Sequence, residues 1–130
     1  MLVKETKYTD FNGDERTEKL YFNLSSAEVI ALQFGNIGGL DKALERLTNT
    51  EDVGEIFKIV DKFIVSAYGE KSDDGRYFNK SEEISTKFKQ SAAYSNLLIE
   101  LLNETGKFEE FVNGVIPKEV NEAIKKENNE

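Results

Sequence analysis

Residues 4–25 read KETKYTDFNGDERTEKLYFNLS, and this stretch decides how the chain begins to fold. Its centre, Asn12-Gly13, is the preferred middle of a two-residue type I′ turn, because both residues tolerate a positive φ. Alternating apolar and polar residues flank the turn, which is typical of two antiparallel strands. The stretch therefore predicts a β-hairpin in which Val3 lies opposite Phe22.

This register predicts one apolar and one polar face for the hairpin. The apolar face gathers Val3, Phe11, Leu20, Phe22 and Leu24. The opposite face carries Lys4, Thr6, Lys19 and Tyr21. Because a two-stranded ribbon alone is marginally stable in water, we expect the apolar face to be covered by helices or by a second copy of the chain.

The length of 130 residues fits one domain with a modest core, since 38% of the residues are apolar and 32% are charged. We predict an α+β fold, with an N-terminal β-hairpin followed by a mainly α-helical bundle of five or six short helices. The single domain spans residues 1–117, with the hairpin at about 3–23 and the helices at about 26–116. Residues 118–130 are mostly charged, and we expect a frayed or disordered tail there.

Capping signals place the helices. Ser25 and Glu28 form a capping box that opens a helix running to about Phe34. A second helix is expected at residues 40–47, after a glycine-rich break at 35–39. Thr48 and Glu51 suggest another capping box, which opens the clearest amphipathic helix of the chain. Its apolar stripe contains Val53, Ile56, Phe57, Val60, Phe63, Ile64, Ala67 and Tyr68, and Gly69 is expected to end it.

The second half continues with a polar loop at 69–80 that contains a turn at Asp74-Gly75. Ser81 opens the next helix, and a break is expected near residues 90–91. The apolar stripe of the following helix contains Tyr94, Leu97, Leu98, Leu101 and Leu102, and Gly106 is expected to cap it. A short last helix carries Phe108, Phe111, Val112 and Val115 and leads to Pro117.

The composition removes most reactive chemistry. The chain has no His, Cys or Trp, which excludes imidazole acid/base catalysis, thiol nucleophiles, most zinc sites and disulfides. We therefore expect no enzyme and no cofactor. A net charge of −8 argues against nucleic acid as the main partner. No apolar run is long enough for a membrane span, and the N-terminus does not resemble a signal peptide, so we expect a cytoplasmic protein.

Two acidic stretches resemble ion sites, and both have simpler explanations. Asp10, Asn12 and Asp14 match the first ligand positions of a calcium loop, but position twelve of that loop is Tyr21 and not Glu. Asp74 and its neighbours are ordinary turn residues. We interpret both stretches as turns and expect no metal.

The aromatic residues leave two interpretations open. Nine Phe and five Tyr are many for a small acidic chain. They either fill the core or expose an apolar groove that holds a helix or strand of a partner. Tyr68, Tyr77 and Phe78 flank the polar loop, and further aromatic residues lie near the C-terminal end.

Three blocks of the sequence carry a resemblance to a known family. The first extends from Tyr8 to Ser25, the second from Ser66 to Phe78, and the third combines residues 91–95 with residues 111–117. Together they resemble the tail assembly chaperones of long-tailed bacteriophages and related prophages.

The resemblance implies a nonstructural morphogenesis factor that acts in the host cytoplasm and is absent from the mature virion. It implies binding to the tape measure protein and recruitment of tail tube subunits around it. An acidic chain with apolar surface could shield apolar helices from aggregation while staying soluble itself. The free edges of the hairpin are also compatible with a homo-oligomer.

Two other classes of function stay open at this point. One is a small acidic phage or prophage inhibitor that occupies a basic or nucleic-acid-binding site of a host protein. The other is a hydrolase with a metal held by carboxylates. An exposed apolar groove beside the helix that contains Tyr94 would favour the chaperone, and acidic residues spaced like phosphates along one face would favour the inhibitor.

For partner binding we predict the short last helix. Its candidate contact residues are Phe108, Phe111, Val115 and Ile116, because a partner could complete this helix's packing. On this hypothesis Phe111→Asp weakens partner binding and leaves the fold largely intact.

Overall fold

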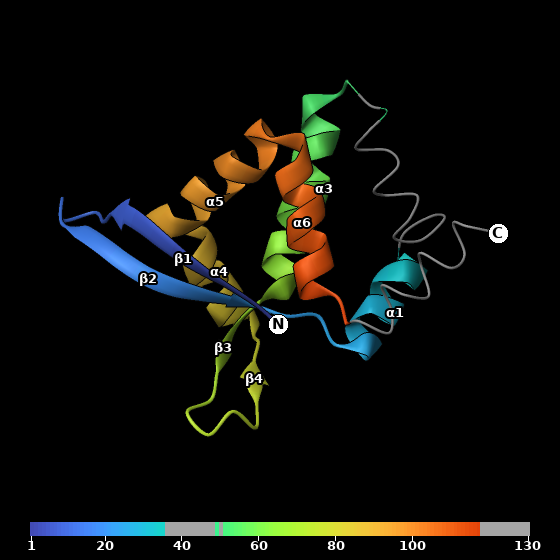
Figure 1. The fold of residues 1–130 in the computed structure, drawn as a ribbon, viewed down its shortest axis with the longest axis horizontal. Coiled ribbons are helices and arrows are strands. Elements are labelled where there is room, and N and C mark those ends of the chain that lie inside the picture. Colours follow the sequence, from blue (N-terminus) through green and yellow to red (C-terminus); the bar gives the residue numbers. More distant parts are fainter. Residues whose placement is uncertain (36–48, 50, 118–130) are drawn as a thin grey trace.

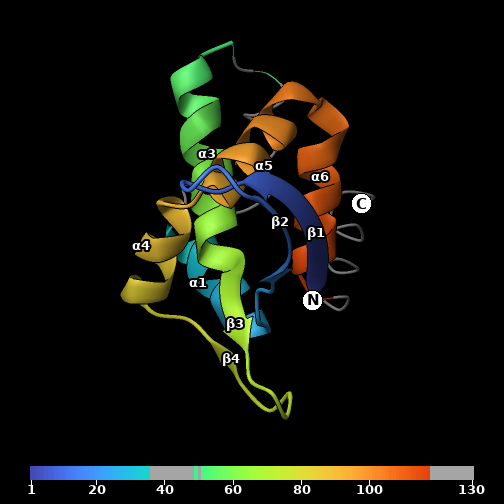
Figure 2. The same ribbon diagram turned by 90° about the vertical axis from the view of Figure 1, so that its left-hand side faces the viewer.

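The chain begins with the predicted hairpin and continues mainly as helices, so the α+β prediction is confirmed (Figures 1 and 2). A computed structural model describes residues 1–35, 49 and 51–117. Its elements are β1 (Leu2–Thr9), β2 (Glu15–Phe22), α1 (Ser26–Gly35), α3 (Val53–Ala67), β3 (Tyr68–Lys71), β4 (Phe78–Asn79), α4 (Glu82–Lys89), α5 (Ala92–Asn103) and α6 (Thr105–Val115). The helix expected at 40–47 and the tail expected at 118–130 lie outside the described residues.

The hairpin turn has three residues, so the two-residue turn predicted from the sequence is wrong. The Gly13 N–H donates to the Asp10 carbonyl at 3.0 Å, and the Asp10 N–H donates to the Asp14 carbonyl at 2.8 Å. Gly13 has a φ of +86°, whereas no residue other than glycine has a positive φ in the described chain. This pattern is a type I turn followed by a left-handed glycine, the common three-residue hairpin loop.

The Asp10 carboxylate holds this turn together. Its Oδ1 accepts the backbone N–H groups of Asn12 at 2.9 Å and Asp14 at 3.0 Å. Its Oδ2 accepts Nε of Arg16 at 2.6 Å. The hydrogen bond from Arg16, followed by those from the backbone, lowers the pKa of Asp10. The acidic residues of this stretch therefore serve the turn, as the sequence interpretation expected.

The longer loop shifts the strand register by one residue. Leu2 pairs with Phe22 and Val3 with Tyr21. In β1 the residues that are partly covered are Leu2, Lys4, Thr6 and Tyr8. Val3 and Phe11 were predicted for the apolar face, but they are 48% and 85% exposed, and Lys4 and Thr6 were placed on the wrong face. The prediction is confirmed for Leu20, Phe22 and Leu24, which are all buried.

A second, smaller hairpin extends the sheet to the order β1-β2-β3-β4, so the polar loop predicted at 69–80 is wrong at its two ends, whereas the turn predicted at Asp74-Gly75 is confirmed. Strand β3 pairs with β2 through Tyr21–Gly69 and Phe22–Tyr68. A Cβ on Gly69 would lie 2.6 Å from the ring of Phe78 and 2.9 Å from the carbonyl oxygen of Asn79. Gly69 is therefore required by this close approach, and α3 ends before it, at Ala67.

Two predicted helix starts, at Ser25 and Ser81, are confirmed by their caps, and the structure adds a third cap at Ser91, where the sequence predicted only a break. The Glu28 N–H donates to Oγ of Ser25 at 3.2 Å, and the Ser25 N–H donates to the Glu28 carboxylate at 3.0 Å. Ser81 accepts the Ile84 N–H and Ser91 accepts the Tyr94 N–H, which start α4 and α5 on either side of the predicted break.

Two other helix boundaries differ from the prediction. Helix α3 starts from Asp52, whose carboxylate accepts the N–H groups of Gly54 and Glu55, whereas Thr48 of the proposed capping box lies outside the described residues. Helix α5 ends at Asn103, and Gly106 lies inside α6 instead of capping α5.

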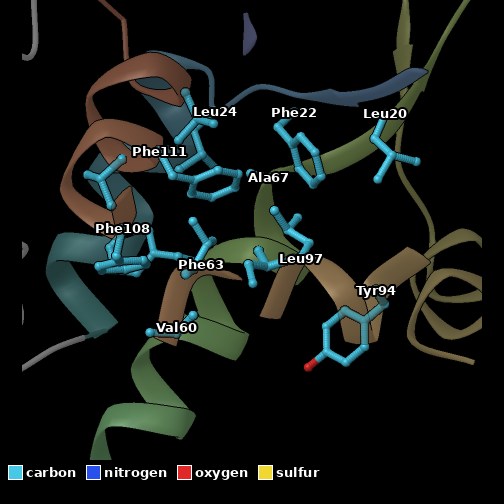
Figure 3. Close-up of a cluster of buried hydrophobic side chains, with 14 of the residues drawn as sticks. Leu20, Phe22, Leu24, Val60, Phe63, Ala67, Tyr94, Leu97, Phe108 and Phe111 are labelled. Carbon is cyan, nitrogen blue, oxygen red and sulfur yellow. The ribbon is translucent and has the colours of Figure 1, made fainter. Parts of the chain in front are cut away.

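One cluster of apolar side chains joins the sheet to the helices, and Phe22 lies within it (Figure 3). Phe22 is fully buried and meets the rings of Tyr68, Phe88 and Phe111 edge to face, with centroids 5.8, 6.0 and 5.1 Å away. Edge-to-face pairs add about 0.5–1.5 kcal/mol each beyond the burial of apolar area. The hairpin is therefore held to α4 and α6 by the end of β2.

Lys80 forms a second junction, between β4 and α4. Its Nζ donates to the carbonyl oxygens of Asn23 at 2.7 Å and Ser66 at 2.8 Å, and to Oε2 of Glu28 at 2.6 Å. Its side chain is 21% exposed. One ammonium group thus joins the end of β2, the start of α1 and the last turn of α3, at carbonyl groups that regular secondary structure leaves unpaired.

We predict that Lys80→Met lowers the free energy of unfolding by about 2–4 kcal/mol, because it leaves two carbonyl groups and a carboxylate without their shared donor. Urea denaturation followed by circular dichroism measures the change. The control is Lys87→Met, since Lys87 is 76% exposed and pairs only across one helical turn with Glu83. It should change the stability by less than about 0.5 kcal/mol. If Lys80→Met and Lys87→Met lower the free energy of unfolding equally, Lys80 does not stabilise the junction.

The same cluster predicts a pH dependence. Partial burial raises the pKa of Glu28, but hydrogen bonds from Lys80 and the Ser25 backbone outweigh it, and the net pKa lies below the usual 4.5. A lowered pKa in the folded state adds stability at higher pH that is lost as the pH falls through that value. We expect the free energy of unfolding to drop below about pH 4.5 and to drop less steeply in Glu28→Gln. The exposed Glu83→Gln serves as the control in acid titrations of urea unfolding.

Candidate partner-binding surface

The structure places all four residues predicted for partner binding in the core. Phe108 is 6% exposed, Phe111 2%, Val115 0% and Ile116 6%. Phe108 packs edge to face against Phe63 at 5.7 Å, and the Val115 carbonyl accepts the Leu24 N–H at 2.9 Å. In this conformation all four side chains belong to the apolar core of the chain, where Figure 3 shows Phe108 and Phe111. The partner-binding role assigned to them stays a prediction.

Most aromatic residues of the described chain also serve the core. Buried rings are those of Phe22, Phe63, Phe88, Tyr94, Phe108 and Phe111. Three aromatic side chains are exposed by more than a third: Phe11 at 85%, Tyr77 at 60% and Phe57 at 41%. Of the two interpretations of the aromatic residues, core packing therefore holds for most of them. Phe11, Tyr77 and Phe57 are left as candidates for contact with a partner.

Helix α3 carries apolar side chains beyond the core. Val53, Phe57, Val60 and Ile64 follow intervals of four, three and four, so they lie along one face of the helix. Val60 and Ile64 are buried, whereas Val53 is 72% and Phe57 41% exposed. The sequence placed the whole stripe in the core, because periodicity shows which face is apolar but not how far neighbouring elements cover it.

A shallow pocket lies between β1 and the helices α5 and α6. It has a volume of about 380 Å³ and is lined by Leu2, Val3, Lys4, Glu5, Glu100, Lys107, Glu110 and Phe111. Glu100, in the helix that contains Tyr94, accepts Lys4 at 3.0 Å and Lys107 at 3.2 Å. Partial burial raises the pKa of Glu100, yet these two hydrogen bonds prevail and lower it. The lining thus combines apolar side chains with five charged ones, so the pocket is mixed in character and is not the purely apolar groove that would favour the chaperone.

Tyr94 links α5 to α3. Its hydroxyl donates to Oδ1 of Asp61, and Nζ of Lys89 lies 3.7 Å from Oδ2 of the same carboxylate. Burial, and then the hydrogen bond to Asp61, raise the pKa of Tyr94. The phenol therefore keeps its proton at neutral pH and acts as a structural donor.

The described residues contain no group of three or more acidic side chains that could hold a metal ion. Within the same ranges, no helix is both long and apolar enough to cross a bilayer. Large apolar side chains are exposed at several places on the described surface, which are Met1, Val3, Phe11, Ile30, Val53, Phe57, Tyr77 and Ile99.

A family described as "Phage tail assembly chaperone" matches residues 1–130, the full length of the sequence. Neither a search of curated proteins nor a search of solved structures gives a match.

The burial of Phe111 predicts the opposite of the outcome expected from the sequence for Phe111→Asp. A carboxylate beside the ring of Phe22 would lose its hydration without gaining a charged partner, so we expect a loss of about 4 kcal/mol or more and global unfolding. Amide dispersion in an NMR spectrum and thermal unfolding measure this. Phe11→Asp is the matched control and should cost less than about 1 kcal/mol. A folded Phe111→Asp variant would restore the partner-binding hypothesis for α6.

Proposed function

The chain belongs to a family of phage tail assembly chaperones, and from this membership we propose that it binds the tape measure protein and recruits tail tube subunits around it. The observation that carries the proposal is the family match over residues 1–130. We propose a binding role without catalysis, in the host cytoplasm, from a factor that leaves before the virion is complete.

The surface chemistry supports this role. A tape measure protein with long amphipathic helices would aggregate through its apolar faces unless they were covered. The chain has a net charge of −8, which keeps a complex in solution through mutual repulsion. Its exposed apolar side chains provide the contact, and its acidic surface provides the solubility.

We propose that the exposed end of the α3 stripe contacts the tape measure protein. Val53 and Phe57 lie one helical turn apart, which matches the spacing by which helices recognise each other's apolar residues. They continue the same face that packs inside the protein from Val60 onward. A partner helix at this position would extend the existing core by another layer.

Three residues of α6 and Ile116, which follows it, form an alternative contact within the same function. Because Phe108, Phe111, Val115 and Ile116 are buried, a partner would reach them only if α6 moved away from the core. This route predicts that binding is coupled to a change in α6, whereas contact at Val53 and Phe57 needs no such change.

Co-expression with the tape measure protein of the same phage tests the function. We expect a soluble complex of fixed stoichiometry, recovered by affinity capture, and an insoluble tape measure protein when it is made alone. Phe57→Asp should reduce the soluble fraction at least severalfold, because it places a charge in the apolar contact.

Tyr77→Asp is the matched control, since Tyr77 lies in the β3–β4 turn and is 60% exposed. Both variants must keep the circular dichroism spectrum of the original chain. Tape measure protein that stays insoluble with the original chain would overturn the proposed partner and favour the acidic inhibitor. If the complex forms equally well with Phe57→Asp, the contact at α3 is excluded, but the proposed partner is not.

A further inference from the structure

Strand β1 ends the sheet, and its outer side has no strand beside it among the described residues. The hairpin extends away from the helices toward its turn, at one end of the molecule (Figure 1). In an antiparallel pair, residues alternate between those whose backbone groups face the neighbouring strand and those whose groups face outward. The Asp10 N–H donates to the Asp14 carbonyl, so the backbone groups of Asp10 face β2. Every second residue of β1, counted back from Asp10, therefore also faces β2, and the residues between them face outward.

The outward-facing backbone groups are therefore those of Val3, Glu5, Lys7 and Thr9. The structure supports this assignment independently, since the Lys7 carbonyl accepts Nδ2 of Asn96 from outside the sheet, at 3.4 Å. A carbonyl oxygen has two lone pairs, so this long bond leaves room for a second donor. Helix α5 contacts this edge at the Lys7 carbonyl, and the other outward-facing groups of β1 have no hydrogen-bond partner among the described residues, so the edge is a template for another strand.

We propose that β1 pairs antiparallel with β1 of a second copy, in the register centred on Thr6. This register places Glu5 opposite Lys7 of the second copy, and Lys7 opposite its Glu5. Neither Glu5 nor Lys7 forms an ion pair within the described chain, and both side chains are exposed. Each pair also exchanges two backbone hydrogen bonds.

The neighbouring registers are disfavoured by charge. A shift that keeps the outward groups facing each other moves the centre to Glu5 or to Lys7. It then sets two glutamates or two lysines directly opposite each other, which destabilises a sheet. Only the register centred on Thr6 makes both charge pairs favourable and also sets Thr6 against Thr6, a pair that sheets favour.

The same register accounts for an exposed cluster at the ends of the strand. Continuing the pairing past Thr9 brings Phe11 of the second copy beside Met1 and Val3. These three side chains are 85%, 54% and 48% exposed in the single chain. Their contact would remove apolar area from water, at about 25 cal/mol per Å². The dimer therefore covers the most exposed aromatic ring of the described chain.

Light scattering after size exclusion, over a range of protein concentrations, tests the pairing. We expect a reversible dimer. Lys7→Glu sets like charges opposite each other twice and should weaken the dimer about tenfold or more. The double change Glu5→Lys with Lys7→Glu restores opposite charges and should recover the dimer. Thermal unfolding of each variant confirms that the single chain stays folded.

Disulfide cross-linking tests the register, because the chain has no cysteine of its own. Two copies of Thr6→Cys would meet at about 4.5 Å between Cα atoms, within the range of a disulfide. Two copies of Thr9→Cys, the control on the same strand, would lie about 20 Å apart in this register. Selective cross-linking of Thr6→Cys supports the pairing. A monomer at every concentration, a dimer that Lys7→Glu leaves unchanged, or equal cross-linking at both positions would overturn it.

Discussion

The burial of Phe22 is the interaction on which the rest of the fold depends. This side chain ends β2, pairs across the sheet with Tyr68 of β3, and meets the rings of Phe88 in α4 and Phe111 in α6. A buried Phe contributes about 1.5–3 kcal/mol from the transfer of its surface out of water, before the ring contacts are added. Because four elements meet at one side chain, the position of the hairpin and that of the last helix are fixed together.

Local signals in the sequence were sufficient for most of the fold. The caps at Ser25, Ser81 and Ser91 depend on residues three positions apart, so the sequence contains all that determines them. The hairpin register was missed because Asn-Gly suits both two-residue and three-residue loops. The Asp10 carboxylate, which binds two N–H groups inside the loop, favours the longer one. Strands β3 and β4 were missed because β3 is defined by its pairing with β2, a contact between distant parts of the chain.

The candidate site was less predictable than the fold. An apolar stripe on a helix has the same spacing whether it faces the core or a partner, so α6 was assigned to a partner and the first turns of α3 to the core. Burial separates the two cases, and it depends on elements more than fifty residues away in sequence, such as Phe22 against Phe111. The family could be predicted: the resemblance carried by the three sequence blocks is confirmed by the match to phage tail assembly chaperones.

The turn at Asp10 also has a consequence for the order of folding. All of its hydrogen bonds join residues within a span of seven, from Asp10 to Arg16, so the turn needs nothing from the rest of the chain. Hairpins of this kind form in about 1–10 μs, whereas contacts with high sequence separation form later because their loops cost more entropy to close. The local contacts of the turn thus favour one register of β1 and β2, and the packing of the helices against Leu20 and Phe22 then stabilises it.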